Sequence, residues 1–264
     1  MANSFDKIEV GNYYHIYNRG INNCSLFERE EDYQRFLLLY EKYITPIADT
    51  IAWVLMPNHF HFLIRIKENV RYKYSMEEIA NAKINAVRSE DADRLSADNI
   101  QINKWATVTL PDVIKDPSAL RGNDVTAEVG GNDASSGITL SGTSTQTGHS
   151  RLPQPAKHLS HLFNAYARYY NTRYNRHGAL FERPYRRKQV DSDNYFRQLI
   201  IYIHNNPRHH GFVHSALEYG WSSYLDYLNA GNEIYSSCVD EYFGDINNFK
   251  ACHQTGKVDD DFFE

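Results

Sequence analysis

Two histidines stand one residue apart in the segment HFHFLIRIK, directly after Pro57 and Asn58. Side chains two positions apart lie on the same face of a β-strand, so His59 and His61 would point to one side of a sheet. Two imidazoles on one face can bind a single metal ion. The other face of this strand is apolar and is expected to pack on the core: Phe60, Phe62, Ile64 and Ile66. The pattern also fits two hydrogen-bonded histidines without a metal.

A second group of polar side chains lies in the segment SDNYFRQLIIYIHNNP. We expect a helix here, capped by Asp191 or Ser192 and ended by Asn206 and Pro207. Its apolar stripe consists of Phe196, Leu199, Ile200 and Ile203. At about 100° per residue, Tyr202 lies roughly 120° from the centre of that stripe. Tyr202 would lead a polar face that also holds Tyr195, Gln198 and Asn206, although a tyrosine packed at the edge of the core would show the same spacing.

Charge is distributed unevenly along the chain. The formal net charge is −5, which by itself disfavours binding to the phosphates of nucleic acid. One segment has the opposite sign, because it holds a single acid, Glu182, and seven bases: Arg168, Arg173, Arg176, Arg183, Arg186, Arg187 and Lys188. Residues 89–151 carry nine acids and five bases, and four more acids lie at the C-terminus. The basic segment is therefore a candidate phosphate-binding surface, with an ordinary solvated helix face as the alternative.

Composition excludes several other classes of protein. The three cysteines, Cys24, Cys238 and Cys252, are far apart and show no CxxC spacing, so neither a disulfide framework nor a zinc ribbon is indicated. No stretch approaches the roughly 20 apolar residues that cross a bilayer, and the N-terminus lacks a signal-peptide pattern. We expect a cytoplasmic protein without a membrane partner.

Hydrophobic periodicity predicts an α+β fold. The expected order is strand, helix, two strands in a hairpin, insertion, helix, strand and helix, at residues 13–17, 33–44, 51–56, 59–67, 89–152, 159–170, 180–190 and 192–207. This order suits a ferredoxin-like split βαβ antiparallel sheet with helices on one face. Residues 1–88 and 153–230 would form one domain, with a flexible insertion at 89–152 and an acidic C-terminal tail at 231–264. A short helix at 76–87 and a small lobe at 102–113 are further expectations.

Four blocks of the sequence, in order, carry a family resemblance. PNHFHFLI resembles the HUH signature of rolling-circle nucleases and single-tyrosine transposases. YIHNNPRHHGFV, which begins at Tyr202, and WSSY, at residues 221–224, are similar to blocks of the REP-associated tyrosine transposases. The opening block YYHIYNRGINNCSLFEREEDYQRFL is similar to the start of that family and includes Arg19 and Gly20. The blocks fall within residues 13–88 and 155–228.

The resemblance implies a DNA-cleaving and DNA-rejoining enzyme. Tyr202 would be the nucleophile, and His59 and His61 would bind Mg²⁺ or Mn²⁺. Distant relatives use a glutamine as the third ligand where this chain has Asn206, and the long insertion is a second departure from the family. The implied partner is single-stranded or hairpin DNA, held by Arg19 and the seven bases of the basic segment. A homodimer with shared active sites would also fit.

Two other functions remain open at this point. A nucleic-acid-binding protein without catalytic activity could keep the same fold, and a metal-dependent nuclease could use water in place of Tyr202. A covalent adduct between the protein and DNA would separate the transposase from both.

Overall fold

The computed structural model describes residues 7–68, 70, 72–74, 149–151, 153–229 and 231–255. The chain divides into two compact units, one formed by Met1–Glu68 with Gln154–Glu264 and the other by Asn69–Pro153. In the second unit, β4 (Tyr72–Tyr74) and β5 (His149–Arg151) form a two-stranded antiparallel sheet. The helix expected at 76–87, the lobe at 102–113 and nearly all of the insertion at 89–152 lie outside the described residues.

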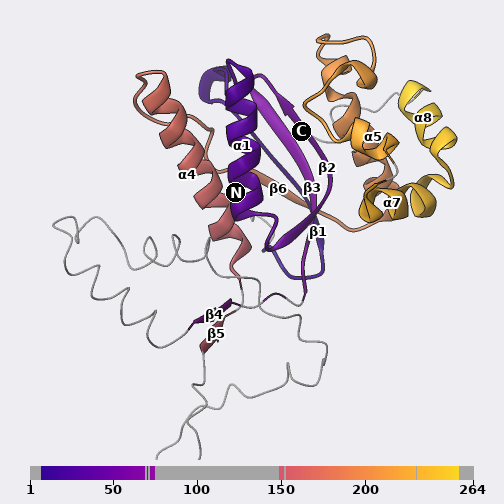
Figure 1. Cartoon of the computed structure of the whole chain (residues 1–264), viewed down its shortest axis with the longest axis horizontal. Coiled ribbons are helices and arrows are strands. Elements are labelled where there is room, and N and C mark those ends of the chain that lie inside the picture. Colours follow the sequence, from indigo (N-terminus) through magenta and orange to yellow (C-terminus); the bar gives the residue numbers. More distant parts are fainter. Residues whose placement is uncertain are drawn as a thin grey trace, which may run out of the picture. The chain divides into compact units, whose positions relative to one another are not determined.

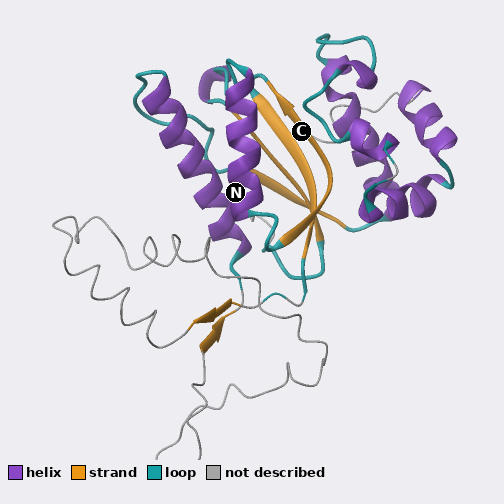
Figure 2. Cartoon of the chain, viewed as in Figure 1, coloured by secondary structure: helices purple, strands orange, loops and turns teal. Residues whose placement is uncertain are grey.

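The first unit is built on a four-stranded antiparallel sheet (Figures 1 and 2). Its strands run in the order β2-β3-β1-β6, with β1 at Tyr13–Arg19, β2 at Ala48–Met56, β3 at His59–Ile66 and β6 at Arg186–Val190. Pro57 and Asn58 form the turn of the β2–β3 hairpin, as the sequence predicts. Because β1 lies between β3 and the last strand, the order is that of the ferredoxin-like arrangement. The last strand is shorter than expected and begins at Arg186 instead of residue 180.

Two helices cover one face of the sheet, as expected (Figure 1). They are α1 (Glu30–Tyr43) and α4 (Pro155–Arg173). Phe36 of α1 packs against Phe60 of β3 and Tyr166 of α4, with ring centroids 5.2 Å and 5.0 Å apart. The apolar side of β3 therefore meets the apolar stripes of both helices, which is why the alternation along β3 predicts this part of the core.

The third helix lies on the opposite face, which corrects the expectation that all helices share one face (Figure 1). Helix α5 spans Asp193–His209, is capped by Ser192 and continues past the predicted stop at Asn206, with Pro207 inside it. Leu63 of β3 is fully buried beneath α5, together with apolar residues of β2: Ala52, Val54 and Met56. The face that carries the histidines is thus apolar enough to bury a helix of its own.

Residues 231–255 form packed helices, which corrects the prediction of an acidic tail from 231. The helices of this region are α7 (Glu233–Phe243) and α8 (Ile246–Thr255). They follow the 3₁₀ turn η3 (Ala216–Glu218) and the short helix α6 (Tyr224–Leu228). A further 3₁₀ turn, η1 (Ile21–Asn23), comes directly after β1. Phe249 of α8 is fully buried and stacks on Tyr227 at 5.0 Å between ring centroids. The acids of this region lie outside an apolar stripe that buries α7 and α8 against α5. In the described part of the chain, no helix is both long and apolar enough to cross a bilayer.

A chain of hydrogen bonds ties the WSSY segment to this layer. The backbone N–H of Trp53 in β2 donates to Oγ of Ser223 at 2.9 Å, and Oγ of Ser223 lies 2.8 Å from Nε2 of His204. Nδ1 of His204 lies 3.0 Å from Nε2 of His253, whose Nδ1 donates to the carbonyl of Phe249 at 2.7 Å. In this series of hydrogen bonds His204 and His253 each need only one ring proton, so both imidazoles are satisfied in the neutral form.

We expect the protein to lose stability as the pH falls from about 6.5 toward 4. Burial lowers the pKa of His158 and of His253 to about 4 and lowers the pKa of His204 as well. The unfolded chain binds protons first, at its ordinary histidine pKa of about 6.5, so acid favours unfolding by roughly 1 to 2 kcal/mol per buried histidine. Urea unfolding midpoints at about pH 7 and about pH 5 measure this loss.

A matched variant for this measurement is His158→Asn. Nδ1 of His158 donates to the carbonyl of Tyr43 at 2.7 Å, and the amide of asparagine can donate from the same position. This variant should therefore lose less stability between the two pH values than the wild-type protein. Equal midpoints at both pH values in the wild-type protein would contradict neutral buried histidines.

Candidate functional site

His59 and His61 share one face of β3, as the sequence predicts. Their ring centroids lie 5.4 Å apart and the rings are nearly perpendicular. His61 is buried and His59 is partly buried. His61 is buried because α5 covers this face of the sheet.

Tyr202 comes from α5 and packs against the same histidine. Its ring is perpendicular to that of His61, with centroids 5.3 Å apart, and only 1% of its surface is exposed. The helical spacing places Tyr202 away from the apolar stripe, but α5 lies between the sheet and helices α7 and α8 and is buried on nearly all sides. The side of α5 that appears polar in the sequence is therefore the side that contacts the histidine pair.

Asn206 lies one turn after Tyr202 and contacts the other histidine of the pair. Its Oδ1 lies 2.8 Å from Nε2 of His59, and Oδ1 of Asn58 lies 2.8 Å from Nδ1 of the same ring. Burial lowers the pKa of His59 to about 4, so the ring is neutral at pH 7 and carries one proton. A ring with one N–H can donate to one of these amides and accept from the NH₂ group of the other, since an amide can turn either end toward the ring.

His15 of β1 completes a row of three imidazoles. Its Nε2 lies 2.9 Å from Nδ1 of His61, and its ring stacks on Tyr17 at 4.5 Å. Burial lowers the pKa of His15 to about 3, and it also lowers the pKa of His61. When Nδ1 of His61 donates to His15, the Nε2 of His61 presents a lone pair. Nδ1 of His15 is buried without a hydrogen-bond partner, which costs free energy of folding. The hydrogen bond between His15 and His61, which fixes the tautomer of His61, would explain why this cost is tolerated.

A small pocket opens beside the histidine pair. Its volume is about 10 Å³, close to that of one water molecule. Its walls include two positive charges, Arg19 and Arg186, and one acid that the sequence did not predict at the site, Glu182. The remaining lining residues are Tyr17, Asn18, His59 and His61. The register explains the arrangement, because Arg19 pairs with His59 and Tyr17 pairs with both His61 and Arg186. We call this the histidine pocket.

Only some of the predicted basic residues lie near the histidine pocket. Arg186 and Lys188 of β6 are exposed, and they lie on the histidine face because they pair with Tyr17 and His15. Lys188 also lies over the ring of Tyr195 at 4.7 Å. Together with Arg19 they form a basic rim on this face of the sheet.

The other five predicted bases have different surroundings. Arg173 is ion-paired with Glu31 and Asp32 of α1, with nitrogen–oxygen distances of 3.4 Å and 3.5 Å. Arg176 donates to Asn171 and to the carbonyl of Ala179, so it holds the loop after α4. The last three do not line the histidine pocket: Arg168 is exposed on α4, Arg183 lines a second pocket, and Arg187 donates to the hydroxyl of Tyr185.

His59, His61 and the amide of Asn206 are the side chains here that could hold a divalent ion. Among the residues that the structure describes, no three His, Cys, Asp or Glu side chains come together as metal ligands, so the candidate site consists of His59, His61 and the amide of Asn206. Neighbouring ligands of octahedral Mg²⁺, each about 2.1 Å from the ion, lie about 3 Å apart. Nε2 of His59 and Oδ1 of Asn206 are 2.8 Å apart, a distance that a hydrogen bond between them also gives. Three neutral ligands would leave coordination positions for water or phosphate oxygens.

Comparison with known proteins gives one distant structural match. No protein-family model matches the chain, and no curated protein matches it. Among solved structures, a REP-associated tyrosine transposase bound to a REP hairpin is similar, with 10% sequence identity, a TM-score of 0.47 and coverage of 89% of this chain and 90% of that chain. A match this distant does not assign the chain to a family.

We expect Mn²⁺, titrated calorimetrically into the protein, to bind at the histidine pair. His59→Ala should abolish binding, because it removes the ligand that faces both His61 and Asn206. Asn206→Ala should weaken binding, and Asn206→Asp should strengthen it, since a carboxylate is a better ligand than an amide for a hard cation.

Two further variants test specificity and the role of His15. His214→Ala, which removes an exposed histidine elsewhere, should bind Mn²⁺ like the wild-type protein. His15→Leu should lower the affinity by about 10-fold or more, whereas His15→Gln retains an acceptor for His61 and should lower it less. Equal binding by His59→Ala and His214→Ala would rule out the histidine pair as the metal site.

Proposed function

We propose that this protein is a metal-dependent enzyme that cleaves and rejoins single-stranded DNA through a covalent bond to Tyr202. The observation that carries the proposal is the contact between Tyr202 and His61, at 5.3 Å between ring centroids, beside the contact between Asn206 and His59. Four polar side chains from two separate sequence blocks, Tyr202, Asn206, His59 and His61, lie in contact with one another in the fold. Their types are those of a nucleophile and a metal site.

The basic rim supports a phosphate-containing substrate. Arg19 and Arg186 line the histidine pocket, and Lys188 lies next to Arg186 on the same face of β6. A phosphodiester carries negative charge that repels a nucleophile, and these three cations would offset it. Among the described residues that line the pocket, Glu182 is the one acid, so the net charge of its lining is positive.

The reaction begins with attack of the Tyr202 oxygen on phosphorus. The bond between phosphorus and the 3′ oxygen breaks, the phenolic proton is transferred to the departing 3′ oxygen through solvent, and the products are a 5′-phosphotyrosine and a free 3′-hydroxyl. Mg²⁺ or Mn²⁺ held by His59, His61 and Asn206 would neutralise the phosphate and polarise phosphorus. Rejoining is the same exchange in reverse with another 3′-hydroxyl, so no nucleotide cofactor is needed.

Tyr202 must become accessible for this reaction. Its side chain is only 1% exposed between α5 and the sheet, and in-line attack requires the hydroxyl to approach phosphorus to within about 3.5 Å. We infer that DNA binding opens the contact between α5 and β3. The four residues proposed for the site, Tyr202, His59, His61 and Asn206, belong to one chain, so a second copy is not needed to assemble the site. A homodimer remains a separate prediction.

Tyr202→Phe should abolish covalent attachment to a labelled single-stranded or hairpin oligonucleotide. The substitution removes the nucleophilic oxygen and keeps the ring that packs against His61. Attachment is measured as labelled protein that survives denaturing electrophoresis.

Tyr195→Phe is the matched control, because Tyr195 is also a buried tyrosine of α5 and packs against Lys188. It should retain the adduct. Cleavage without any adduct in the wild-type protein would indicate attack by water, and binding without cleavage would indicate a protein that only binds DNA.

The basic rim should set the salt dependence of binding to single-stranded DNA. Arg186→Ala and Lys188→Ala should each lower the slope of log affinity against log salt by about 0.7 if each residue contacts one phosphate. Fluorescence anisotropy over a series of salt concentrations measures the slope.

Arg173→Ala is the matched control for these two variants. Arg173 is ion-paired with Glu31 and Asp32, so its loss should leave the slope unchanged. A slope that changes with Arg173→Ala and not with Arg186→Ala would move the DNA surface to α4.

A further inference from the structure

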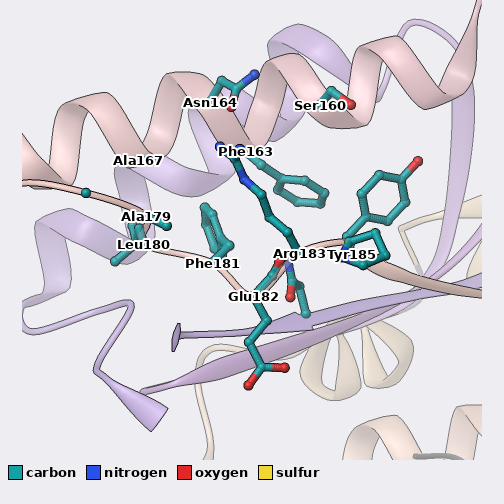
Figure 3. Close-up of a pocket in the computed structure, with 13 residues that line it drawn as sticks. Ser160, Phe163, Asn164, Ala167, Ala179, Leu180, Phe181, Glu182, Arg183 and Tyr185 are labelled. Atoms are coloured by element: carbon teal, nitrogen blue, oxygen red, sulfur yellow. Dashed lines mark hydrogen bonds between the residues drawn. The ribbon is translucent and has the colours of Figure 1, made fainter. Parts of the chain in front are cut away.

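A second and larger pocket lies between α4 and residues 178–185 (Figure 3). Its volume is about 530 Å³, within the range of about 300 to 1,000 Å³ that is typical of small-ligand sites. The lining residues that matter for its chemistry are Ser160, Phe163, Asn164, Phe181, Arg183 and Tyr185. None of them has a role in the reaction proposed for the histidine pocket. We call this the aromatic pocket.

Three aromatic rings form one side of the aromatic pocket. The ring of Phe163 lies 5.4 Å from that of Phe181 and 5.3 Å from that of Tyr185, measured between centroids. Phe163 and Phe181 are nearly buried and also contact Phe60 of β3, so the core fixes their positions. A rigid aromatic wall suits a flat, unsaturated ligand, which can stack without ordering flexible side chains.

Polar groups lie at the edge of the same pocket. Ser160 and Asn164 are one turn apart on α4 and are both exposed. Figure 3 shows the side chain of Arg183 extending from the opposite wall toward α4. Hydroxyl, amide and guanidinium groups can bind the donor and acceptor atoms on the edge of a nucleobase. An aromatic wall with such an edge distinguishes this pocket from a purely apolar cavity.

The aromatic pocket adjoins the histidine pocket. Asn18 and Glu182 line both of them. The amide of Asn18 donates to the carbonyl of Glu182 at 3.2 Å, and the N–H of Glu182 donates to the carbonyl of Arg19 at 2.9 Å. In Figure 3 the carboxylate of Glu182 points away from α4, so it leaves the aromatic pocket free of negative charge from this residue. A strand with a phosphate between Arg19 and Arg186 would therefore have this pocket within reach of a neighbouring nucleotide.

We propose that the aromatic pocket binds one unpaired nucleobase of the strand whose backbone lies along the basic rim. The inference rests on the proposed function in so far as that strand is DNA. The base stacks on the partly exposed ring of Tyr185, which packs against the buried ring of Phe163, and its edge meets Ser160, Asn164 and Arg183. The pocket thereby fixes which phosphate reaches the histidine pair.

The test compares two strands of equal length, an oligodeoxythymidylate and a strand of abasic residues with the same phosphates. Both are titrated into the full-length protein in the presence of EDTA, so that binding is measured without cleavage. The wild-type protein should bind the thymidylate strand about 10-fold more tightly or better, because base–aromatic stacking is lost on the abasic strand. Ala167→Phe fills the aromatic pocket and should reduce that ratio by about 10-fold while leaving binding to the abasic strand unchanged.

Thr172→Phe is the matched control, since it adds the same ring at an exposed position of α4 outside the pocket, and it should keep the wild-type ratio. Asn164→Ala, at an exposed position, should keep the preference for strands with bases but change the relative affinities for thymidylate, cytidylate and adenylate strands. A ratio that stays at the wild-type value in folded Ala167→Phe, with no change of base preference in Asn164→Ala, would overturn the proposal. Equal weakening of both strands by Ala167→Phe would also overturn it, because the pocket would then hold backbone.

This experiment and the adduct assay fail independently. Loss of the base-dependent ratio in Ala167→Phe supports the aromatic pocket even if Tyr202 forms no adduct. An adduct on Tyr202 together with an unchanged ratio would support the enzyme and overturn the pocket.

Discussion

The packing of α5 on the histidine face of the sheet is the contact on which the candidate site depends. Leu63 of β3 and the apolar side chains of β2 bury this helix along its length, and α7 and α8 cover its other side. A helix held on two sides has little freedom to move single side chains independently. Tyr202 and Asn206 therefore reach the histidine pair because of core packing. The contact between Asn206 and His59, which are 147 positions apart, needs no special loop to form.

The same burial determines the charge of the site. His15, His59 and His61 lie beneath α5, where desolvation lowers each pKa and keeps the rings neutral at pH 7. Neutral imidazoles can bind a cation, whereas protonated ones would repel it. The permanent positive charges lie at the rim, on Arg19 and Arg186, where the guanidinium groups need not be desolvated. Neutral imidazoles beneath α5, together with permanent positive charges at the rim, would allow a metal ion and a phosphate to bind next to each other.

Much of the fold could be predicted from local patterns, because they depend on few residues. The alternation along β3 places His59 and His61 on one face, and the cap at Ser192 starts α5 where the sequence indicates. What could not be predicted is the second surface that each element meets. The angle between Tyr202 and the apolar stripe predicts a polar face only if α5 packs on one side, whereas α5 packs on two sides. The acids around α7 obscure an apolar stripe that extends to Phe249 of α8. Partners distant in sequence decide both cases.

The basic segment shows why local charge is a weaker guide than the register of a strand. Arg186 and Lys188 reach the histidine face and Arg187 does not, because side chains alternate along β6. Val190 fixes this alternation, since it is buried on the same face opposite Tyr13. A shift of one residue in the register of β6 would turn Val190 away from the histidine face and bring Arg187 to that face. The shift would also cost free energy, because charged side chains would lose water on the other face of the sheet. The burial of Val190 thus favours the register that brings Arg186 and Lys188, and not Arg187, to the histidine face.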